Sequence, residues 1–149
     1  FDTSGWEGMP EIQWREVLLE DDADVWSDEY FRVTGAPGIH GVPVTALRIE
    51  ARNDGGVVTY SADTEPCDSV VRLAHGSDIL VHEATGRFEG HSDAEQAADV
   101  AARAGVGRLL LVHVPPAERL GPANMVTAGE RFQPIEVGTE GGTYEFRPR

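Results

Sequence analysis

Residues 79–113 read ILVHEATGRFEGHSDAEQAADVAARAGVGRLLLVH, and this stretch decides the fold class. It begins with the short apolar run Ile79–His82 and ends with Arg108–His113, whose four central residues are all apolar, as in strands buried on both faces. Between them the spacing of alanines predicts a helix over Ser92–Ala104, which begins on an S-x-x-E capping box and is followed by a glycine. A strand, a helix and a second strand in this order are typical of a layered α/β fold.

The rest of the chain extends this alternation. The patterns predict further strands over Ile12–Leu19, Phe31–Thr34, Val42–Glu50, Val57–Tyr60 and Thr143–Arg147, and further helices over Cys67–Ala74 and Met125–Arg131. The sequence Asn53-Asp54-Gly55-Gly56 predicts a hairpin turn, because Asn, Asp and Gly tolerate positive φ. We expect one α/β domain over residues 1–149, since no repeat or low-complexity segment divides the chain.

The charge of the chain limits its partners. The formal net charge is −14, and residues 1–30 hold ten acidic residues against one Arg. Proteins that grip nucleic acid normally present a basic surface, because neutralising phosphates supplies most of their affinity. The acidic segment is typical of a solvated edge. The composition therefore argues against a nucleic-acid-binding surface within these residues.

Neither a membrane nor an oxidising compartment is indicated. No apolar run approaches the roughly 18 residues of a membrane-spanning helix, and the first residues, FDTSGW, lack the pattern of a signal peptide. The single cysteine, Cys67, excludes an internal disulfide and a cysteine-based zinc finger. We expect a cytoplasmic protein with no membrane partner. The chain does not begin with Met, so we also expect it to be a piece of a longer protein.

Polar side chains suited to metal binding come at or just after the predicted strands. Asp63 follows Val57–Tyr60, Glu83 follows the next strand, and His113 ends the strand after that. Ligands gather at the carboxyl ends of strands in α/β sheets, and His and Asp are ligand types for zinc or manganese. From these residues alone the alternatives stay open: structural histidines at strand ends, and an Asp63 that caps a turn.

Five motifs occur in order between Phe31 and Pro116. They are Ile39-His40-Gly41-Val42, Tyr60-Ser61-Ala62-Asp63-Thr64, Val81-His82-Glu83-Ala84-Thr85, Gly90-His91-Ser92, and the alanine helix that leads to Leu110-Leu111-Val112-His113-Val114. Each motif is weak by itself. In this order and with this spacing they resemble the metallo-β-lactamase-fold hydrolases, and in particular their ribonuclease Z group.

The resemblance implies a fold and a metal centre. The fold would be half of an αββα sandwich, a mixed sheet with helices packed on one face. His40 would bind the first of two divalent metal ions, Asp63 would bridge both, and His113 would bind the second. A hydroxide bridging the ions would be the nucleophile. Zinc is the default metal for this ligand set, with manganese or iron as alternatives.

The resemblance also implies a proton-transfer pair. Glu83 and His91 match the family pair that passes a proton to the leaving oxygen, a role that needs a histidine oriented by a carboxylate. A plain structural ion pair is the alternative for these two residues. His82 is expected to orient a neighbour rather than to bind metal.

Part of the family's ligand set has no counterpart in this sequence. The His-x-His-x-Asp-His signature, which supplies four ligands in the family, does not occur in these 149 residues. Three protein ligands do not complete two metal sites. We therefore expect a C-terminal half-domain that is active only with an N-terminal half from the same or another chain, and that exposes one sheet face without it. A degenerate, non-catalytic half-domain that acts as an assembly or binding module is the alternative.

Departures from the family pattern bear on the substrate. Ala62 replaces the motif's glycine, Asp93 replaces the threonine after His-Ser, and the connection between Ile49 and Val57 is a tight hairpin with no resemblance to a basic arm for tRNA. With the charge of −14, these features argue against tRNA and favour a small phosphodiester or related ester. A lactonase or arylsulfatase-type hydrolase of the same fold, and a homodimer, remain open.

Overall fold

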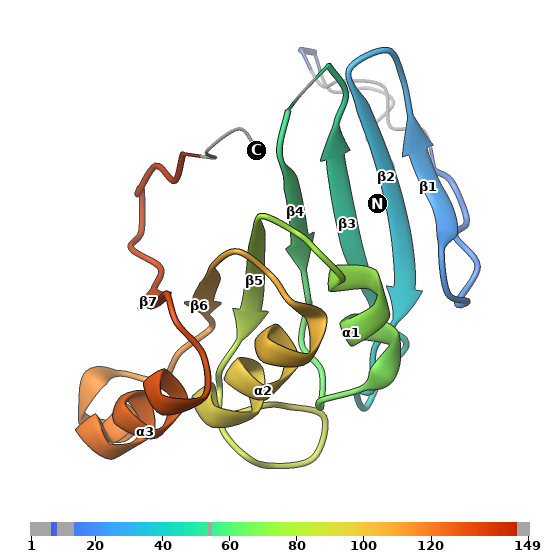
Figure 1. Ribbon diagram of the computed structural model, residues 1–149. Helices are drawn as coiled ribbons and strands as arrows, with labels where there is room; N and C mark the ends of the chain where they lie inside the picture. The colour runs from blue at the N-terminus through green and yellow to red at the C-terminus, as the bar shows by residue number, and fades with distance from the viewer. Residues whose placement is uncertain (1–6, 9–13, 54, 146–149) are drawn as a thin grey trace.

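Among the residues described by the computed structural model (7–8, 14–53 and 55–145), seven strands form one sheet in which each strand lies beside its sequence neighbours (Figure 1). The strands are β1 (Ala23–Ser27), β2 (Phe31–Pro37), β3 (Thr45–Ala51), β4 (Val57–Tyr60), β5 (Ile79–Glu83), β6 (Leu109–Val112) and β7 (Ile135–Val137). The helices are α1 (Asp68–Ala74), α2 (Ala94–Ala104) and α3 (Ala117–Arg131). No helix in these described ranges is long and apolar enough to span a bilayer.

The first four strands are antiparallel and are joined by short connections. Between β1 and β2, the Asp28 carboxylate accepts the backbone N–H groups of Tyr30 at 2.8 Å and Phe31 at 2.7 Å, which holds the chain reversal. Between β3 and β4, Asn53 adopts a positive φ of 62°, as the predicted hairpin turn requires. Because direction alternates from strand to strand, β2 and β4 run the same way.

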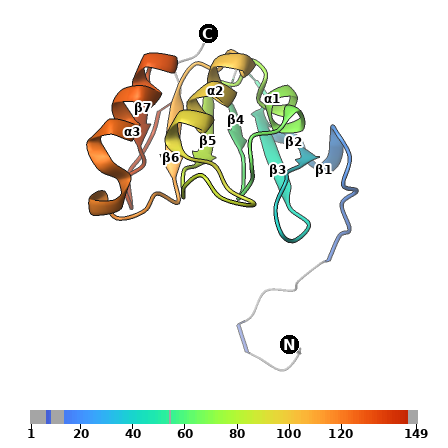
Figure 2. The ribbon, with the colours of Figure 1, turned by 90° about the horizontal axis from the view of Figure 1, so that it is seen from below.

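From β4 onwards the strands are parallel, and a helix crosses over between each pair. All three helices lie on the same side of the sheet (Figure 2). The clearest of them, α2, begins on a capping box in which Asp93 accepts from the Gln96 backbone at 2.8 Å and the Gln96 side chain accepts from the Asp93 backbone at 3.1 Å. It ends on Gly105, whose φ of 62° closes the last turn.

The hydrophobic core lies between the helices and the sheet. Leu80 of β5 and Leu109 and Leu111 of β6 are fully buried beneath α2 and its neighbours. The helix presents small side chains to them: Ala94, Ala97, Ala98, Ala101 and Ala104. Alanine lets a helix pack close to a sheet with little loss of side-chain entropy. The alanine spacing in the sequence therefore sets how closely α2 covers the strands that end at the candidate site.

The opposite face of the sheet is apolar and only half buried. The side chain of Arg48 lies on the helix side of the sheet, because its guanidinium donates to the carbonyls of Leu73 in α1 and His75 just after it, each at 2.9 Å. The residues before and after it in β3, Leu47 and Ile49, therefore face the other side of the sheet. Strand pairing places Leu47 and Ile49 beside apolar side chains of β2, β4 and β5 on that face. We call this surface the open face; it consists of Val33, Leu47, Ile49, Val58, Tyr60 and Val81.

The predicted fold class is confirmed, and most predicted elements correspond to observed ones. The boundaries differ in the middle of the chain, where β2 continues to Pro37 and β3 begins only at Thr45. The helix predicted over Met125–Arg131 begins earlier, at Ala117. The α2 cap is Asp93 with Gln96, one residue later than the predicted Ser92 and Glu95, because Ser92 is buried and donates instead to the Thr64 carbonyl at 2.7 Å.

Both predicted terminal strands are wrong. Residues 14–19 form no strand, and the remainder of the predicted Ile12–Leu19 lies outside the described residues. The edge strand is β1, which follows the acidic residues 20–22 and pairs with β2 through backbone hydrogen bonds that need no apolar pattern. At the other end, residues 143–145 are irregular, and the rest of Thr143–Arg147 is likewise outside the described residues. The last strand is β7, whose three residues are too few to give a periodicity.

Candidate metal centre

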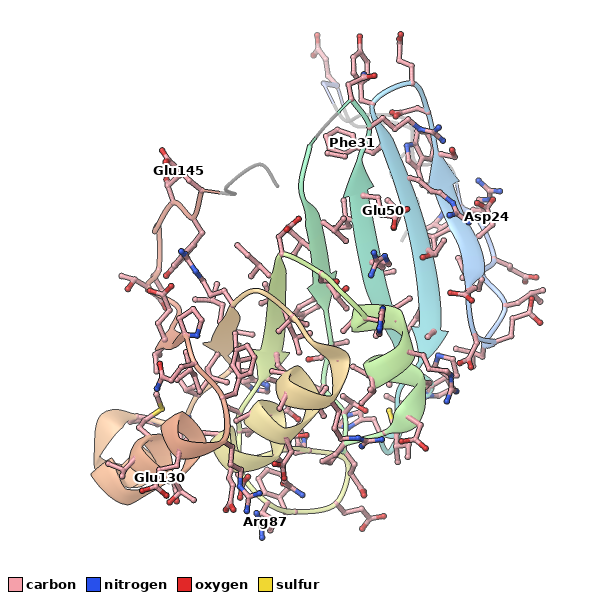
Figure 3. The ribbon with its side chains drawn as sticks, in the orientation of Figure 1. Asp24, Phe31, Glu50, Arg87, Glu130 and Glu145 are labelled. Carbon is pink, nitrogen blue, oxygen red and sulfur yellow. The ribbon has the colours of Figure 1, made fainter. Side chains whose placement is uncertain are left out.

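Four strands end at the same edge of the sheet, and each is followed by residues of the candidate site. His40 follows β2, Asp63 follows β4, Glu83 is the last residue of β5, and His113 follows β6. In Figure 3, the labelled Arg87, in the loop after β5, lies at this edge of the molecule, whereas Phe31 lies at the opposite edge. The predicted convergence of these side chains is therefore a consequence of strand direction.

The five sequence-predicted side chains come together in two overlapping groups. The ligand atoms of His40, Asp63 and His91 lie within 4.8 Å of one another, and so do those of Glu83, His91 and His113. His91 is common to both groups: its ring centroid lies 4.9 Å from that of His40 and 6.0 Å from that of His113. His113 Nδ1 also donates to Asp63 Oδ1 at 3.0 Å. The resemblance paired His91 with Glu83, and the structure also groups it with the proposed ligands His40, Asp63 and His113.

The donor set fits a divalent cation. Two ligands on one zinc ion, each at about 2.0–2.2 Å from it, are roughly 3–4.4 Å apart, so donor atoms grouped within 4.8 Å can close on an ion with small side-chain movements. His40 Nδ1 donates to the Gly90 carbonyl at 2.8 Å. That bond leaves the lone pair on Nε2, the tautomer a metal ligand needs.

Four hydrogen-bond donors hold the buried carboxylate of Glu83. It is 1% exposed, and its Oε1 accepts from the backbone N–H groups of Ser92 at 2.9 Å and Thr64 at 3.2 Å. Its Oε2 accepts from the Thr85 backbone at 2.8 Å. Oε1 also accepts from His91 Nδ1 at 3.0 Å, which orients the imidazole and leaves Nε2 as the second reactive position.

Two residues at this edge have positive φ although neither is glycine. Ala62, just before Asp63, has φ 53°, and His113 has φ 49°. Left-handed conformations are costly for side chains with a Cβ and concentrate at functional sites. The φ of Ala62 explains why a glycine at this position suits the motif that the sequence resembles.

His82 lies apart from the cluster. Its side chain is fully buried on the helix side of the sheet and belongs to neither group of potential ligands. Nδ1 donates to the Glu83 carbonyl at 2.8 Å, while Nε2 has no hydrogen-bond partner among the described residues. Burial lowers the pKa of this imidazole, so the neutral form is favoured.

The sequence did not identify the buried residues that hold Glu83 and the His40 loop in place. Thr64 and Ser92 are buried, and their backbones bind Glu83. Thr64 Oγ1 also accepts the Ile39 N–H at 2.8 Å, next to His40. Both residues belong to the quoted motifs, which is a signal that they matter, but their partners lie in other loops and follow only from the folded arrangement.

Comparison with known proteins identifies the family of the chain. The family model described as Beta-lactamase superfamily domain matches residues 2–114. A ribonuclease Z from Ignicoccus hospitalis is 39% identical over 115 residues, which cover 72% of this chain and 34% of that protein. A ribonuclease Z from Mycobacterium tuberculosis H37Rv is 34% identical over 145 residues, which cover 83% of this chain and 52% of that protein. The chain thus spans between a third and about half of these relatives.

Solved structures show the same fold. The metallo-β-lactamase fold protein YhfI from Bacillus subtilis superposes with a TM-score of 0.70 and 26% identity, over 80% of this chain and 52% of that chain. The short form of human tRNase Z superposes with a TM-score of 0.64 and 23% identity, over 82% and 47% of the respective chains, a likeness of fold alone. Because the family match covers most of the chain and the fold agrees, this protein belongs to the β-lactamase superfamily, with the metallo-β-lactamase fold.

Proposed function

We propose that this chain forms part of a metal-dependent hydrolase that cleaves a phosphodiester or a related small ester. One observation carries the proposal: three histidines and two carboxylates from the ends of four strands meet at one sheet edge, in two overlapping groups whose ligand atoms lie within 4.8 Å of one another. The names of the relatives, ribonuclease Z, support the phosphodiester class.

In this proposal His40, Asp63 and His113 would hold two divalent ions, with zinc as the default and Asp63 as the residue that would bind both. Two contacts of Asp63 support a bridging role: it is grouped with His40 and hydrogen-bonded to His113. Ions bound there would lower the pKa of a water molecule and polarise the ester to be cleaved.

His91 would hold the proton for the leaving oxygen. Glu83 accepts a hydrogen bond from Nδ1–H of His91 and would compensate the positive charge of the imidazole when its second nitrogen, Nε2, also carries a proton. The Phe88 ring lies 4.7 Å from that of His91, between centroids, and covers one side of the imidazole. A histidine fixed by a buried carboxylate and partly shielded from water is suited to donate from Nε2.

We propose further that an N-terminal half of the domain packs on the open face and supplies the remaining ligands. The open face is apolar over four strands, and Tyr60 within it is 41% exposed. Contiguous apolar surface of this kind is typical of an interface. The coverage of the relatives, 34% and 52% of their lengths, leaves room for such a segment.

The substrate within the phosphodiester class is a separate question. The relatives are named for RNA, and one structural neighbour for tRNA. The charge of −14 in this chain favours a smaller substrate. That tRNA is not cleaved stays a prediction, as does the cytoplasmic location.

Metal analysis and a substrate panel test the proposal together. In the complete protein, elemental analysis should find bound metal that His113→Ala reduces, whereas His75→Ala, which removes an exposed histidine outside the site, should leave it unchanged. The panel is bis(p-nitrophenyl) phosphate, p-nitrophenyl sulfate, a lactone and a precursor tRNA. Metal-dependent cleavage of the phosphodiester is the expected result. Absence of metal from the complete protein would instead support a non-catalytic binding module.

A further inference from the structure

Glu65 lies two residues after Asp63 and is in neither group of potential ligands. Its side chain is nevertheless connected to the site through the backbone of another residue, Gly90. Its Oε1 accepts the backbone N–H of Gly90 at 2.9 Å. The carbonyl of the same glycine accepts from His40 Nδ1 at 2.8 Å. One glycine therefore connects the carboxylate of Glu65 to the imidazole of a proposed metal ligand.

The backbone at Gly90 comes so close to His40 that no side chain fits between them. A Cβ at this position would lie 2.5 Å from His40 Nδ1 and 3.2 Å from its Cε1. The φ of Gly90 is +81°, which disfavours other residues as well. Gly90 therefore has a backbone conformation that suits glycine alone. The Glu65 carboxylate holds it there by accepting the hydrogen bond of the Gly90 amide.

The same segment also binds the loop that contains His40. The Ile39 N–H donates to Thr64 Oγ1 at 2.8 Å, and the Glu65 N–H donates to the Ile39 carbonyl at 2.9 Å. These bonds use the backbone of Glu65 and the side chain of Thr64, so they survive replacement of the Glu65 side chain. The Glu65 side chain adds a bond to a third loop, the one between β5 and α2, which contains Gly90 and His91.

We infer that Glu65 is a positioning residue: by fixing Gly90, it keeps the His40 proton on Nδ1 and directs the lone pair of Nε2 towards Asp63 and His91. Partners of this kind, one step behind a metal ligand, set the tautomer and ring orientation and typically change metal affinity by about 10- to 100-fold. The part of the inference that concerns metal rests on the proposed function. The part that concerns the tautomer does not.

The test compares Glu65→Ala and Glu65→Asp with two reference variants. Glu65→Gln keeps an oxygen acceptor at the same reach and should rescue the wild-type behaviour. Glu89→Ala removes the same charge from an exposed position next to Gly90 and is the matched control. In metal-free protein, long-range ¹H–¹⁵N NMR of the imidazoles reports the His40 tautomer, and hydrogen exchange reports protection of the Gly90 amide. Competition with a zinc chelator gives the zinc affinity of each variant.

Wild type, Glu65→Gln and Glu89→Ala should show His40 protonated on Nδ1 and a slowly exchanging Gly90 amide. Glu65→Ala should show a mixed tautomer, faster Gly90 exchange and zinc affinity lower by about 10- to 100-fold. Glu65→Asp, shorter by one methylene, should fall between them and provides the test if the alanine variant does not fold. An unchanged tautomer and unchanged Gly90 exchange in both variants would overturn the inference. If the tautomer responds but the protein has no hydrolase activity, only the proposed function fails.

Discussion

His113 Nδ1 and Asp63 Oδ1 lie 3.0 Å apart although fifty positions separate the two residues in the sequence. They meet because β4 and β6 flank β5 as parallel strands, so the residues that follow them project from the same edge. The contact brings two proposed ligands of different strands to one place.

Glu83→Gln and His91→Ala should lower turnover without removing metal. General acid catalysis typically contributes about 10²- to 10⁴-fold, so kcat should fall within that range in both variants. Metal content, measured in the same samples, should stay at the wild-type value. Because the ligand atoms of His91 are also grouped with those of His40 and Asp63, a loss of metal in His91→Ala would make this residue a ligand and contradict the assignment.

Ala62→Gly should stabilise the protein. The φ of 53° at Ala62 costs an L-residue with a Cβ about 1–2 kcal/mol, of which the greater freedom of glycine in the unfolded chain offsets part. We expect a net gain of about 0.5–1 kcal/mol in the free energy of unfolding, measured by urea denaturation. Gly105→Ala is the converse control: its φ is 62° with open space around a Cβ, so it should lose about 1 kcal/mol through conformation alone. A loss of stability in Ala62→Gly would show that the alanine side chain has a packing role.

Acid should destabilise the fold through His82. Burial lowers the pKa of His82 in the folded protein, so between that value and about 6.5 the unfolded chain binds more protons. Its contribution to stability is therefore complete above about pH 6.5 and is lost as the pH falls through that value towards the folded pKa. His82→Asn, whose amide can still donate to the Glu83 carbonyl, should flatten this part of a stability–pH curve from urea unfolding. His75→Asn, at an exposed position, is the matched control. Parallel curves for His82→Asn and wild type would remove His82 as the cause.

Ile49→Asp should destabilise the complete protein severely. Ile49 lies at the centre of the open face, paired with Val33 on one side and Val58 on the other. If the proposed N-terminal half covers this face, the substitution buries an unpaired charge and should cost about 3 kcal/mol or more by urea denaturation. Val126→Asp places the same charge on an exposed apolar residue of α3 and should change stability by no more than about 0.5 kcal/mol. Equal effects of the two substitutions would mean that the open face is not covered.

Features that depend on neighbouring residues could be predicted from the sequence alone. The alternation of apolar runs with the alanine helix predicted the β5–α2–β6 unit, because burial imposes a period on each element locally. The position of Asp63, Glu83 and His113 at or just after strands predicted that they would meet, since parallel strands end at a common edge. The motif order added His40 and His91 to the same site.

The sequence could not determine the edge strands or the contacts between loops. β1 and β7 have no clear apolar pattern because backbone pairing with one neighbour is enough to hold them. The Ser92 side chain donates to the Thr64 carbonyl, 28 positions away, so Asp93 rather than Ser92 caps α2. Tertiary structure alone also places Glu65 against Gly90, since strand order and register decide which loops adjoin, and local periodicity contains no information about either.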